Sequence, residues 1–356
     1  MFSIDVVADQ LRGSIYKWVR NGRVQIVFAR LYTAFMRATR ILDQPIIQPG
    51  MDDRIGTNIN GPSLIRVPAW VTQPLGRYYL YFSHHKGTFI RLAYADDLDG
   101  PWKIHRPGVL DVSESLFAPT DPPEPPPDQR PSWAESLPGG YLYAHVASPD
   151  VHIDEESQQI RMYYHGLLDN GDQKTRIACS EDGLHFVPRA PLLGPPYFRV
   201  VRHKDWIYAT TWQGRFLRAR HWDGPFEVQR DPGPAMQLFG ENSVLELRHP
   251  ALWLKGGTLH LFFSCMGDCP EQIYHCQCEV DKDWDDWVFT EPRILLSPQE
   301  VWEGSDRPRQ PSVVGTATER LCELRDPGIF VDDDQVYILY SGAGEAAIGI
   351  ARLEEH

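Results

Sequence analysis

Carboxylate and histidine side chains stand beside prolines at several points where an apolar run of the sequence begins. Asp150 lies in Ser-Pro-Asp-Val, and Asp326 lies in Leu-Arg-Asp-Pro. The related stretch Glu-Leu-Arg-His-Pro carries Glu246 and His249. A group that holds a proton and a carboxylate that accepts one can act together as a general acid and base. We therefore predict that Asp150, Asp326, His249 and Glu246 are the catalytic candidates of this chain.

A second set of polar residues lies at the ends of the same apolar runs, and we predict that it binds a ligand. Histidine and asparagine can hydrogen-bond hydroxyl groups, and the guanidinium group of arginine presents a fixed fork of donors. These candidates are Asn58, Asn60, His84, His85, His152, His165, Arg248, Glu323 and Arg325. In the alternative interpretation each arginine pairs with the glutamate two residues earlier, Asp150 caps a turn, Asp326 pairs with Arg325, and His249 is a hydrogen-bonded structural histidine.

An internal repeat explains why these residues recur. Pro250 and Pro327 each stand 14 residues before a serine that ends the following apolar strand. The same pattern begins at Pro62 and Pro149 and, more loosely, at Pro196. Three or four antiparallel strands in each of five such units predict an all-β fold, a five-bladed β-propeller.

Composition and charge exclude several classes of protein. The 356 residues include 30 Pro, 28 Gly, 15 Phe, 15 Tyr and 11 Trp, which fits short aromatic strands joined by tight turns and disfavours a helical bundle. The formal charge of −13 argues against a nucleic-acid partner, because phosphate binding needs a basic surface. No apolar run approaches the roughly 18 residues of a membrane span, so we expect no membrane partner.

The cysteines and the amino-terminal residues indicate the cellular compartment that we expect for this protein. Cys265, Cys269, Cys276 and Cys278 cluster in the sequence, but they lack the two well-separated pairs typical of a zinc site. We therefore expect plain thiols in a reducing cytoplasm. The first ten residues lack the pattern of a secretory leader, which fits the same expectation.

Residues 11–42 differ from the rest, with seven basic residues and no acidic one. Apolar residues there recur at intervals of three and four, which is helical spacing, and Asn21-Gly22 marks a break. We predict a helical hairpin within residues 1–45 that packs on the main domain or forms a homodimer contact, and a propeller over residues 46–356. A membrane-surface helix or a DNA-binding helix pair are the alternatives. The fifth unit lacks an outer strand, which we expect the segment around Ile46 and Ile47 to supply.

From about residue 50 onward the chain resembles the five-bladed propeller glycoside hydrolases: the arabinanase and xylosidase type of family 43, the invertase type and the neoagarobiose hydrolase type. The Ser-Pro-Asp-Val that contains Asp150 is similar to an Ala-Pro-Asp-Val element of arabinanases, whose aspartate orients the acid and tunes its pKa. The Arg-Asp-Pro that contains Asp326 is similar to an element of invertases, whose aspartate stabilises the transition state. The resemblance implies a site at one mouth of the central channel, where carboxylates from different blades converge.

The chain departs from the family pattern at two positions. Gly61 stands where the first blade of the family has an aspartate, the base or nucleophile, directly before the proline. Arg248 stands where arabinanases have their acid glutamate. The resemblance to neoagarobiose hydrolases implies that His249 is the acid, with Glu246 and Glu241 as the carboxylate alternatives.

We therefore predict a glycoside hydrolase, exo-acting on an oligosaccharide by acid/base catalysis in the central channel. It requires no cofactor in this interpretation, although the resemblance to arabinanases allows a calcium or other divalent ion in the channel. Two alternatives stay open. One is a glycoside phosphorylase that binds phosphate through Arg248, Arg325 and His249. The other is a propeller that binds carbohydrate without catalysis, for which Gly61 is the strongest argument.

Overall fold

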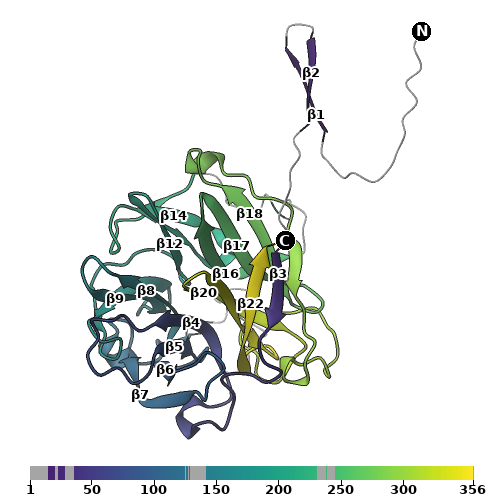
Figure 1. Cartoon of the computed structure of the whole chain (residues 1–356). Helices are drawn as coiled ribbons and strands as arrows, with labels where there is room; N and C mark the ends of the chain where they lie inside the picture. Colours follow the sequence, from purple (N-terminus) through teal and green to yellow (C-terminus); the bar gives the residue numbers. More distant parts are fainter. Residues whose placement is uncertain are drawn as a thin grey trace.

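Five four-stranded antiparallel sheets stand around a common centre in the computed structural model, as the blades of a propeller (Figure 1). The structure describes residues 15–20, 23–28, 36–124, 126, 128, 142–230, 238 and 245–355. The predicted all-β, five-bladed propeller is therefore confirmed. In blades 1 to 4 the strands follow one another outward in chain order, and in blade 5 the outermost strand comes from the start of the chain.

The strands of each blade are given from the centre outward. Blade 1 consists of β4 (Asn60–Arg66), β5 (Tyr78–Ser83), β6 (Phe89–Ala95) and β7 (Lys103–Asp111). Blade 2 consists of β8 (Val146–Asp154), β9 (Gln159–Leu167), β10 (Gln173–Ser180) and β11 (Val187–Pro188). Blade 3 consists of β12 (Arg199–His203), β13 (Trp206–Thr210), β14 (Phe216–Ala219) and β15 (Glu227–Val228). Blade 4 consists of β16 (Glu246–Lys255), β17 (Thr258–Met266), β18 (Ile273–Glu279) and β19 (Arg293–Leu296). Blade 5 consists of β20 (Leu324–Asp332), β21 (Gln335–Gly342), β22 (Ala347–Glu355) and β3 (Met36–Arg40).

The innermost part of every blade holds one residue in the left-handed backbone conformation, at the same place in the repeat. The angle φ is +60° at Gly61, +50° at Ser148, +69° at Tyr197, +46° at His249 and +50° at Asp326. In blades 1, 2, 4 and 5 the pairing with the second strand shifts register at this point, as in a β-bulge. This conformation is costly for residues other than glycine. Four such residues held in it at the propeller centre therefore point to a functional site.

The ring of blades is closed by a strand from the start of the chain. β3 pairs antiparallel with β22, with Arg40 opposite Ala351. The prediction that the segment around Ile46 and Ile47 supplies this strand is wrong, because Ile47 makes only a single bridge to Ile348. The propeller thus begins ten residues before the predicted boundary. The guanidinium group of Arg40 fixes the strand, since its Nε and Nη2 donate to the two carboxylate oxygens of the buried Glu303 at 2.7 and 2.8 Å.

The predicted amino-terminal helical hairpin is also wrong. β1 (Ile15–Arg20) and β2 (Arg23–Phe28) pair as an antiparallel β-hairpin. An Asn-Gly pair in the sequence between two apolar segments favours a hairpin, and the valines, isoleucines and aromatic residues of both segments favour strands. The homodimer predicted through these helices therefore stays a prediction without the helices that motivated it. The segments 1–14 and 29–35 lie outside the described residues.

Apolar side chains fill the space between neighbouring blades. Tyr81 of blade 1 and Tyr164 of blade 2 belong to one buried cluster, and Phe262 of blade 4 and Tyr340 of blade 5 belong to another. All four side chains are almost fully buried. The packed interfaces hold the innermost strands at fixed positions, so the side chains at the centre stand on a rigid frame.

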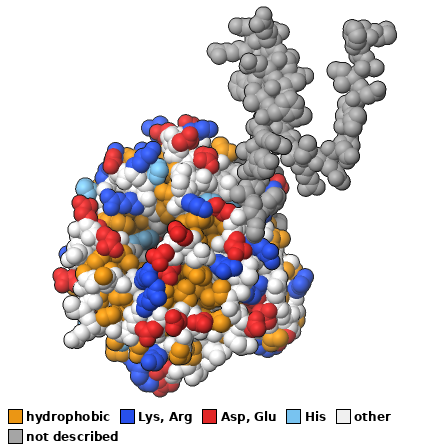
Figure 2. Space-filling model, in the orientation of Figure 1, with side chains coloured by type: hydrophobic (Ala, Val, Ile, Leu, Met, Phe, Trp, Pro, Cys, Tyr) orange, Lys and Arg blue, Asp and Glu red, His pale blue; other side chains and the backbone are white. Residues whose placement is uncertain are grey.

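The surface of the propeller carries mixed charge. Figure 2 shows acidic and basic side chains interspersed over one face rather than gathered by sign. In the described part of the chain, no helix is long and apolar enough to cross a membrane. The absence of a nucleic-acid partner stays a prediction from the net charge.

Candidate active site

Six aromatic side chains form a continuous series at the centre of the propeller, and we call them the aromatic series. They come from the loops and strand ends of blades 1 to 4, and neighbouring ring centroids lie between 4.9 and 6.4 Å apart. In order, they are His85, Tyr143, His145, His165, Tyr197 and His249. Aromatic walls with a few convergent polar groups are typical of small-molecule sites.

Asp326 joins the aromatic series from blade 5. Its Oδ1 accepts a hydrogen bond from the hydroxyl of Tyr197 at 2.9 Å and lies 3.3 Å from Nδ1 of His249. The Asp326 side chain is only 3% exposed. Burial and, after it, the negative charge of Glu345 raise the pKa of Asp326 to about 6, against the opposing effects of Tyr197, Arg199 and Arg248. A carboxyl group with such a pKa keeps its proton in mildly acidic solution and can give it to a substrate.

Three histidines of the aromatic series, His145, His165 and His249, are held in the neutral form. Burial lowers the pKa of His145 to about 4. It also lowers the pKa of His165 and of His249 well below the ordinary value, and the positive charge of Arg248 adds to the effect at His249. A neutral imidazole ring has one donor and one acceptor nitrogen. The series therefore offers a ligand uncharged hydrogen-bonding groups next to the carboxyl group of Asp326.

Arg325 stands in the middle of three buried carboxylates. Its Nη1 lies 3.1 Å from Oε1 of Glu345, its Nε lies 3.3 Å from Oε2 of Glu271, and its Nη2 contacts Glu323. These contacts hold the Arg325 guanidinium in its charged form, and Glu323 is the partner that the alternative sequence interpretation expects. Arg248 donates from Nε to Oε1 of Glu271 at 2.9 Å rather than to Glu246. Both arginines are thus committed to internal ion pairs.

Glu345 extends this network to blade 1. Its Oε2 accepts a hydrogen bond from Nδ2 of Asn58 at 2.6 Å, and its Oε1 lies 3.3 Å from Nδ1 of His85. Burial opposes the charge of Glu345, but His85, Arg325 and Asn58 together hold its pKa well below the ordinary value. An ionised carboxylate is therefore buried beside the aromatic series.

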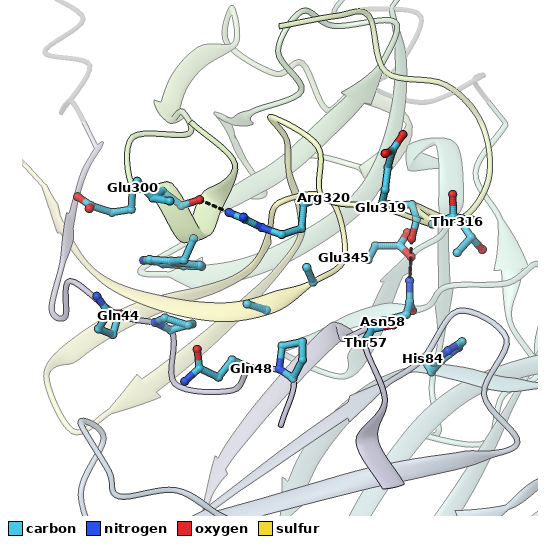
Figure 3. Close-up of a pocket in the computed structure, with 18 of the residues that line it drawn as sticks. Gln44, Gln48, Thr57, Asn58, His84, Glu300, Thr316, Glu319, Arg320 and Glu345 are labelled. Carbon is cyan, nitrogen blue, oxygen red and sulfur yellow. Dashed lines mark hydrogen bonds between the residues drawn. The ribbon is translucent and has the colours of Figure 1, made fainter. Parts of the chain in front are cut away.

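A cavity of about 840 Å³ borders this carboxylate. Figure 3 shows Glu345 and Asn58 facing each other at one side of the cavity, with His84 near them. Burial lowers the pKa of His84 to about 4, so this histidine is neutral as well. Gln48 and Arg320 line the cavity further from Asn58. The cavity gives a ligand room next to the buried network.

Asp150 binds the neighbouring blade instead of joining Asp326. Its Oδ2 accepts hydrogen bonds from the backbone N–H of Val200 at 2.8 Å and from Nε2 of His152 at 2.7 Å. Ser63 occupies the same position of blade 1, two residues after the left-handed residue, and its Oγ accepts from the backbone N–H of Val151 at 2.9 Å. The repetition of this contact indicates that Asp150 links blades 2 and 3.

The remaining predicted residues are distributed around the site. Asn60 donates to Oδ1 of Asn58 at 3.2 Å and accepts from Ser83 at 2.7 Å, so it supports the residue that binds Glu345. His152 packs against Trp222 between blades 2 and 3. Glu246 is exposed at the first position of β16. The structure thus gathers His85, His165, His249 and Asp326, together with the buried ion pairs of Arg248 and Arg325. Asp150 and His152 bind each other at the junction of blades 2 and 3, where the charge of Arg199 also lowers the pKa of Asp150. Glu246 lies at the exposed start of β16, and Glu241 is outside the described residues.

Several residues of the site were missed at the level of the sequence. Glu271 and Glu345 lie in the turns between the second and third strands of blades 4 and 5, the place where His85 lies in blade 1, and this shared position is the signal that could have identified them. Tyr197 follows Pro196, whereas the corresponding residue precedes the proline in the other four blades, so the repeat must be shifted by one residue to find it. Arg199 then follows from the same shift. Nothing in the local sequence marks Tyr143 and His145.

Metal ligands do not converge in the described part of the chain, where no group of three His, Cys, Asp or Glu side chains is arranged to hold an ion. The divalent ion expected in the channel therefore stays a prediction, and the described residues offer no set of ligands for it. The six cysteines are unpaired, and burial raises the pKa of Cys265, Cys276 and Cys278. A raised pKa keeps these thiols protonated and unreactive.

Comparison with known proteins gives one close relative in sequence. No protein-family model matches the chain. The chain is 32% identical over 314 residues to a protein of Acanthamoeba polyphaga mimivirus that bears the name uncharacterized protein R118, and the match covers 83% of each sequence.

Solved structures share the fold at low sequence identity. A family-43 β-xylosidase/α-arabinofuranosidase from a compost microbial metagenome, solved with xylotriose, has a TM-score of 0.53 at 12% identity, over 90% of this chain and 95% of the other. An N-acetylgalactosamine deacetylase from F. plautii, solved with blood group B trisaccharide, has a TM-score of 0.51 at 11% identity, over 89% and 95% of the two chains. The chain therefore has the five-bladed propeller fold of family-43 glycoside hydrolases, as the resemblance implied.

Proposed function

The chain belongs to the same protein family as protein R118 of Acanthamoeba polyphaga mimivirus, and from its own central site we propose that it is a glycoside hydrolase with Asp326 as the general acid. The observation that carries this proposal is the buried carboxyl group of Asp326, which has a pKa of about 6 and hydrogen-bonds Tyr197. A protonated carboxyl group of this kind can give its proton to the glycosidic oxygen as the bond to the anomeric carbon breaks.

Glu345 is the second carboxylate of the proposed mechanism. Burial and neighbouring charges move the pKa values of Asp326 and Glu345 in opposite directions, which is the pattern of an acid and base pair. Glu345 also reaches Asn58, three residues before the Gly61 that replaces the aspartate of the resembled family. In this mechanism Glu345 takes a proton from water, the water oxygen bonds to the anomeric carbon, and Asp326 protonates the departing alcohol.

His249 has a supporting part in this proposal. Its pKa lies well below the ordinary value because of burial and the charge of Arg248. His249 is therefore neutral before the reaction and cannot act as a cationic acid. Its Nδ1 lies 3.3 Å from Asp326, and we assign it the task of orienting the carboxyl group. Asp326 therefore takes the acid role that the sequence resemblance assigned to His249.

The depth of the site favours action at the end of an oligosaccharide. The Asp326 side chain is 3% exposed and that of Glu345 is fully buried, so a continuous polysaccharide would not reach both groups without opening the blades. A terminal sugar can enter such a site. Exo-action on an oligosaccharide, without a required cofactor, is thus part of the proposal.

A carbohydrate-binding propeller without catalysis is the second candidate, and Gly61 and Arg248 at two family carboxylate positions favour it. A phosphorylase finds less support. The three carboxylates around Arg325 already pair with the positive charge that a phosphate group would need.

A panel of oligosaccharides that includes furanosides and anhydro-sugars tests the proposal by proton NMR. We expect release of a terminal sugar without added phosphate or calcium. Release only with phosphate would identify a phosphorylase. Binding without any release would identify the non-catalytic propeller.

A further inference from the structure

Arg199 is a buried arginine whose Nε and Nη2, which carry three of its five N–H donors, have no partner in the described part of the chain. The residue is 2% exposed at the start of β12. Its Nη1 donates to the carbonyl oxygens of Ser148, Pro149 and Phe198 at 3.1 to 3.2 Å. Its Nε and Nη2 have no hydrogen-bond partner among the described residues. The positive charge of Arg199 lowers the pKa values of Asp150 and Asp326, but neither carboxylate is hydrogen-bonded to this edge. Buried N–H donors without hydrogen-bond partners are costly for the fold.

The unused atoms form the edge of the guanidinium group that binds carboxylates elsewhere in this protein. The Nε and Nη2 atoms of Arg40 hold the two oxygens of Glu303 at 2.7 and 2.8 Å. The same two atoms of Arg161 both donate to Oδ2 of Asp154, at 3.0 and 2.8 Å. Paired N–H groups of this geometry match the two oxygens of a carboxylate. Arg199 presents the same fork with nothing in it.

The open fork lies within the central site. The Arg199 guanidinium carbon is 4.2 Å from the centre of the Tyr197 ring, and the Tyr197 hydroxyl binds Asp326. Oδ2 of Asp326, Nδ1 of His165 and Nη2 of Arg248 are also buried atoms without a hydrogen-bond partner among the described residues. Unpartnered polar atoms of blades 2, 3, 4 and 5 therefore occur near the centre of the propeller, and a polar ligand there would give them hydrogen-bond partners.

We propose that the Nε and Nη2 edge of Arg199 binds the carboxylate of an acidic sugar, so that the substrate carries a uronic acid unit next to the bond that is cleaved. This inference rests on the proposed function for the cleavage but not for the binding. The remaining atoms then have partners in the same ligand, because protonated Asp326 can donate to the glycosidic oxygen and sugar hydroxyl groups can hydrogen-bond His165 and accept from Arg248.

The charge balance favours a carboxylate over a phosphate group. One arginine fork matches one negative charge. A phosphate group carries up to two charges and would stand close to Asp326 and the ionised Glu345, where like charges repel. Tyr197, His165 and His249 are uncharged there and would not offset this repulsion.

The experiment compares acidic and neutral sugars on the full chain by titration calorimetry. The probes are galacturonate and glucuronate, their neutral counterparts galactose and glucose, the methyl esters of the two uronates, and inorganic phosphate. We expect at least one uronate to bind about tenfold or more tightly than both its neutral counterpart and its methyl ester. Equal affinity within each set overturns the proposal, and so does phosphate that binds as tightly as the uronate and displaces it.

Arg199→Lys tests the fork, because lysine keeps the charge but cannot present two parallel N–H groups. We expect the preference for the uronate to fall to about twofold or less, with little change for the neutral sugar. Arg176→Lys is the matched control. Nε of Arg176, on β10, is also buried and without a hydrogen-bond partner, but its guanidinium group lies over the ring of Phe117 rather than over Tyr197. A full uronate preference in Arg199→Lys contradicts the proposal. If that variant does not fold, the ester comparison on the unaltered chain decides alone.

The two proposals fail separately. Selective uronate binding without sugar release from any acidic oligosaccharide would remove the hydrolase and keep the carboxylate site. Sugar release from neutral oligosaccharides, without preferential binding of a uronate, would keep the hydrolase and remove the carboxylate site.

Discussion

Tyr197 and Asp326 are joined across the centre of the propeller by a hydrogen bond of 2.9 Å from the phenol to Oδ1. The two residues come from blades 3 and 5, and both have a positive φ at the corresponding position of the repeat. The strained position is thus the point from which the fold delivers polar side chains to one place. The bond also stabilises the ionised form of Asp326 and counteracts part of the rise in its pKa.

Tyr197→Phe should move the pH dependence of catalysis. Asp326 must be protonated to act as the acid, so activity should fall about tenfold per pH unit above its pKa of about 6. Loss of the phenol hydrogen bond raises this pKa, and we expect the alkaline limb of the kcat/KM profile to move upward by about one pH unit. Tyr164→Phe is the control, since that hydroxyl binds the carbonyl of Ser115 instead. An unchanged or lowered limb in Tyr197→Phe would argue against Asp326 as the acid.

Asp150→Ala should weaken the fold more than the chemistry. The substitution leaves the backbone N–H of Val200 without its acceptor, which costs about 1–3 kcal/mol when the donor is buried. Ser63→Ala removes the corresponding contact of blade 1 and should cost about 1 kcal/mol. Urea unfolding measures both. If Asp150→Ala instead keeps its stability and shifts the alkaline limb of the pH profile, Asp150 acts on the catalytic acid, as the resemblance to arabinanases implies.

Arg40→Ala should be strongly destabilising. Glu303 is fully buried and also accepts a hydrogen bond from Tyr340 at 2.8 Å, so the substitution leaves a buried carboxylate without its cation. Breaking such a pair costs about 3–5 kcal/mol. The exposed pair of Arg352 and Glu354, 2.7 Å apart, offers the comparison, because Arg352→Ala should cost less than about 1 kcal/mol. Equal urea midpoints for the two variants would show that the closing strand does not depend on Arg40.

The fold could be predicted from the sequence because short stretches of residues are enough to recognise the repeat. A proline next to the left-handed position and a buried strand after it recur in each blade, with a spacing of 14 residues to the closing serine in blades 4 and 5, and neither signal depends on distant contacts. The same local reasoning failed for residues 15–28. Apolar residues at intervals of three and four fit a helix, yet the two-residue Asn-Gly connection favours a hairpin and the residues pair as strands. The closing strand β3 was missed for a different reason, because its partner β22 is more than 300 residues away.

The site was predictable only in part. Asp326 and His249 stand at the repeated bulge, so the repeat points to them. Glu345 and Arg199 acquire their roles from residues in other blades, such as Asn58 and Tyr197. The sequence also left the pairing of arginines and carboxylates undecided. Arg248 binds Glu271, although Glu246 is closer to it in the sequence. Long-range packing decides such pairs, and a single sequence does not record it.

The central claim is that Asp326 supplies the proton for glycosidic cleavage, and its most direct test is kcat/KM of Asp326→Asn on an oligosaccharide that the unaltered chain cleaves. Asparagine keeps the shape and the hydrogen bond from Tyr197 but has no acidic proton. We predict a loss of about 10²- to 10⁴-fold with an unchanged melting temperature, while Glu246→Gln, at the exposed start of β16, retains activity within about twofold. Wild-type kcat/KM in Asp326→Asn, or an equal loss in Glu246→Gln, would contradict the account.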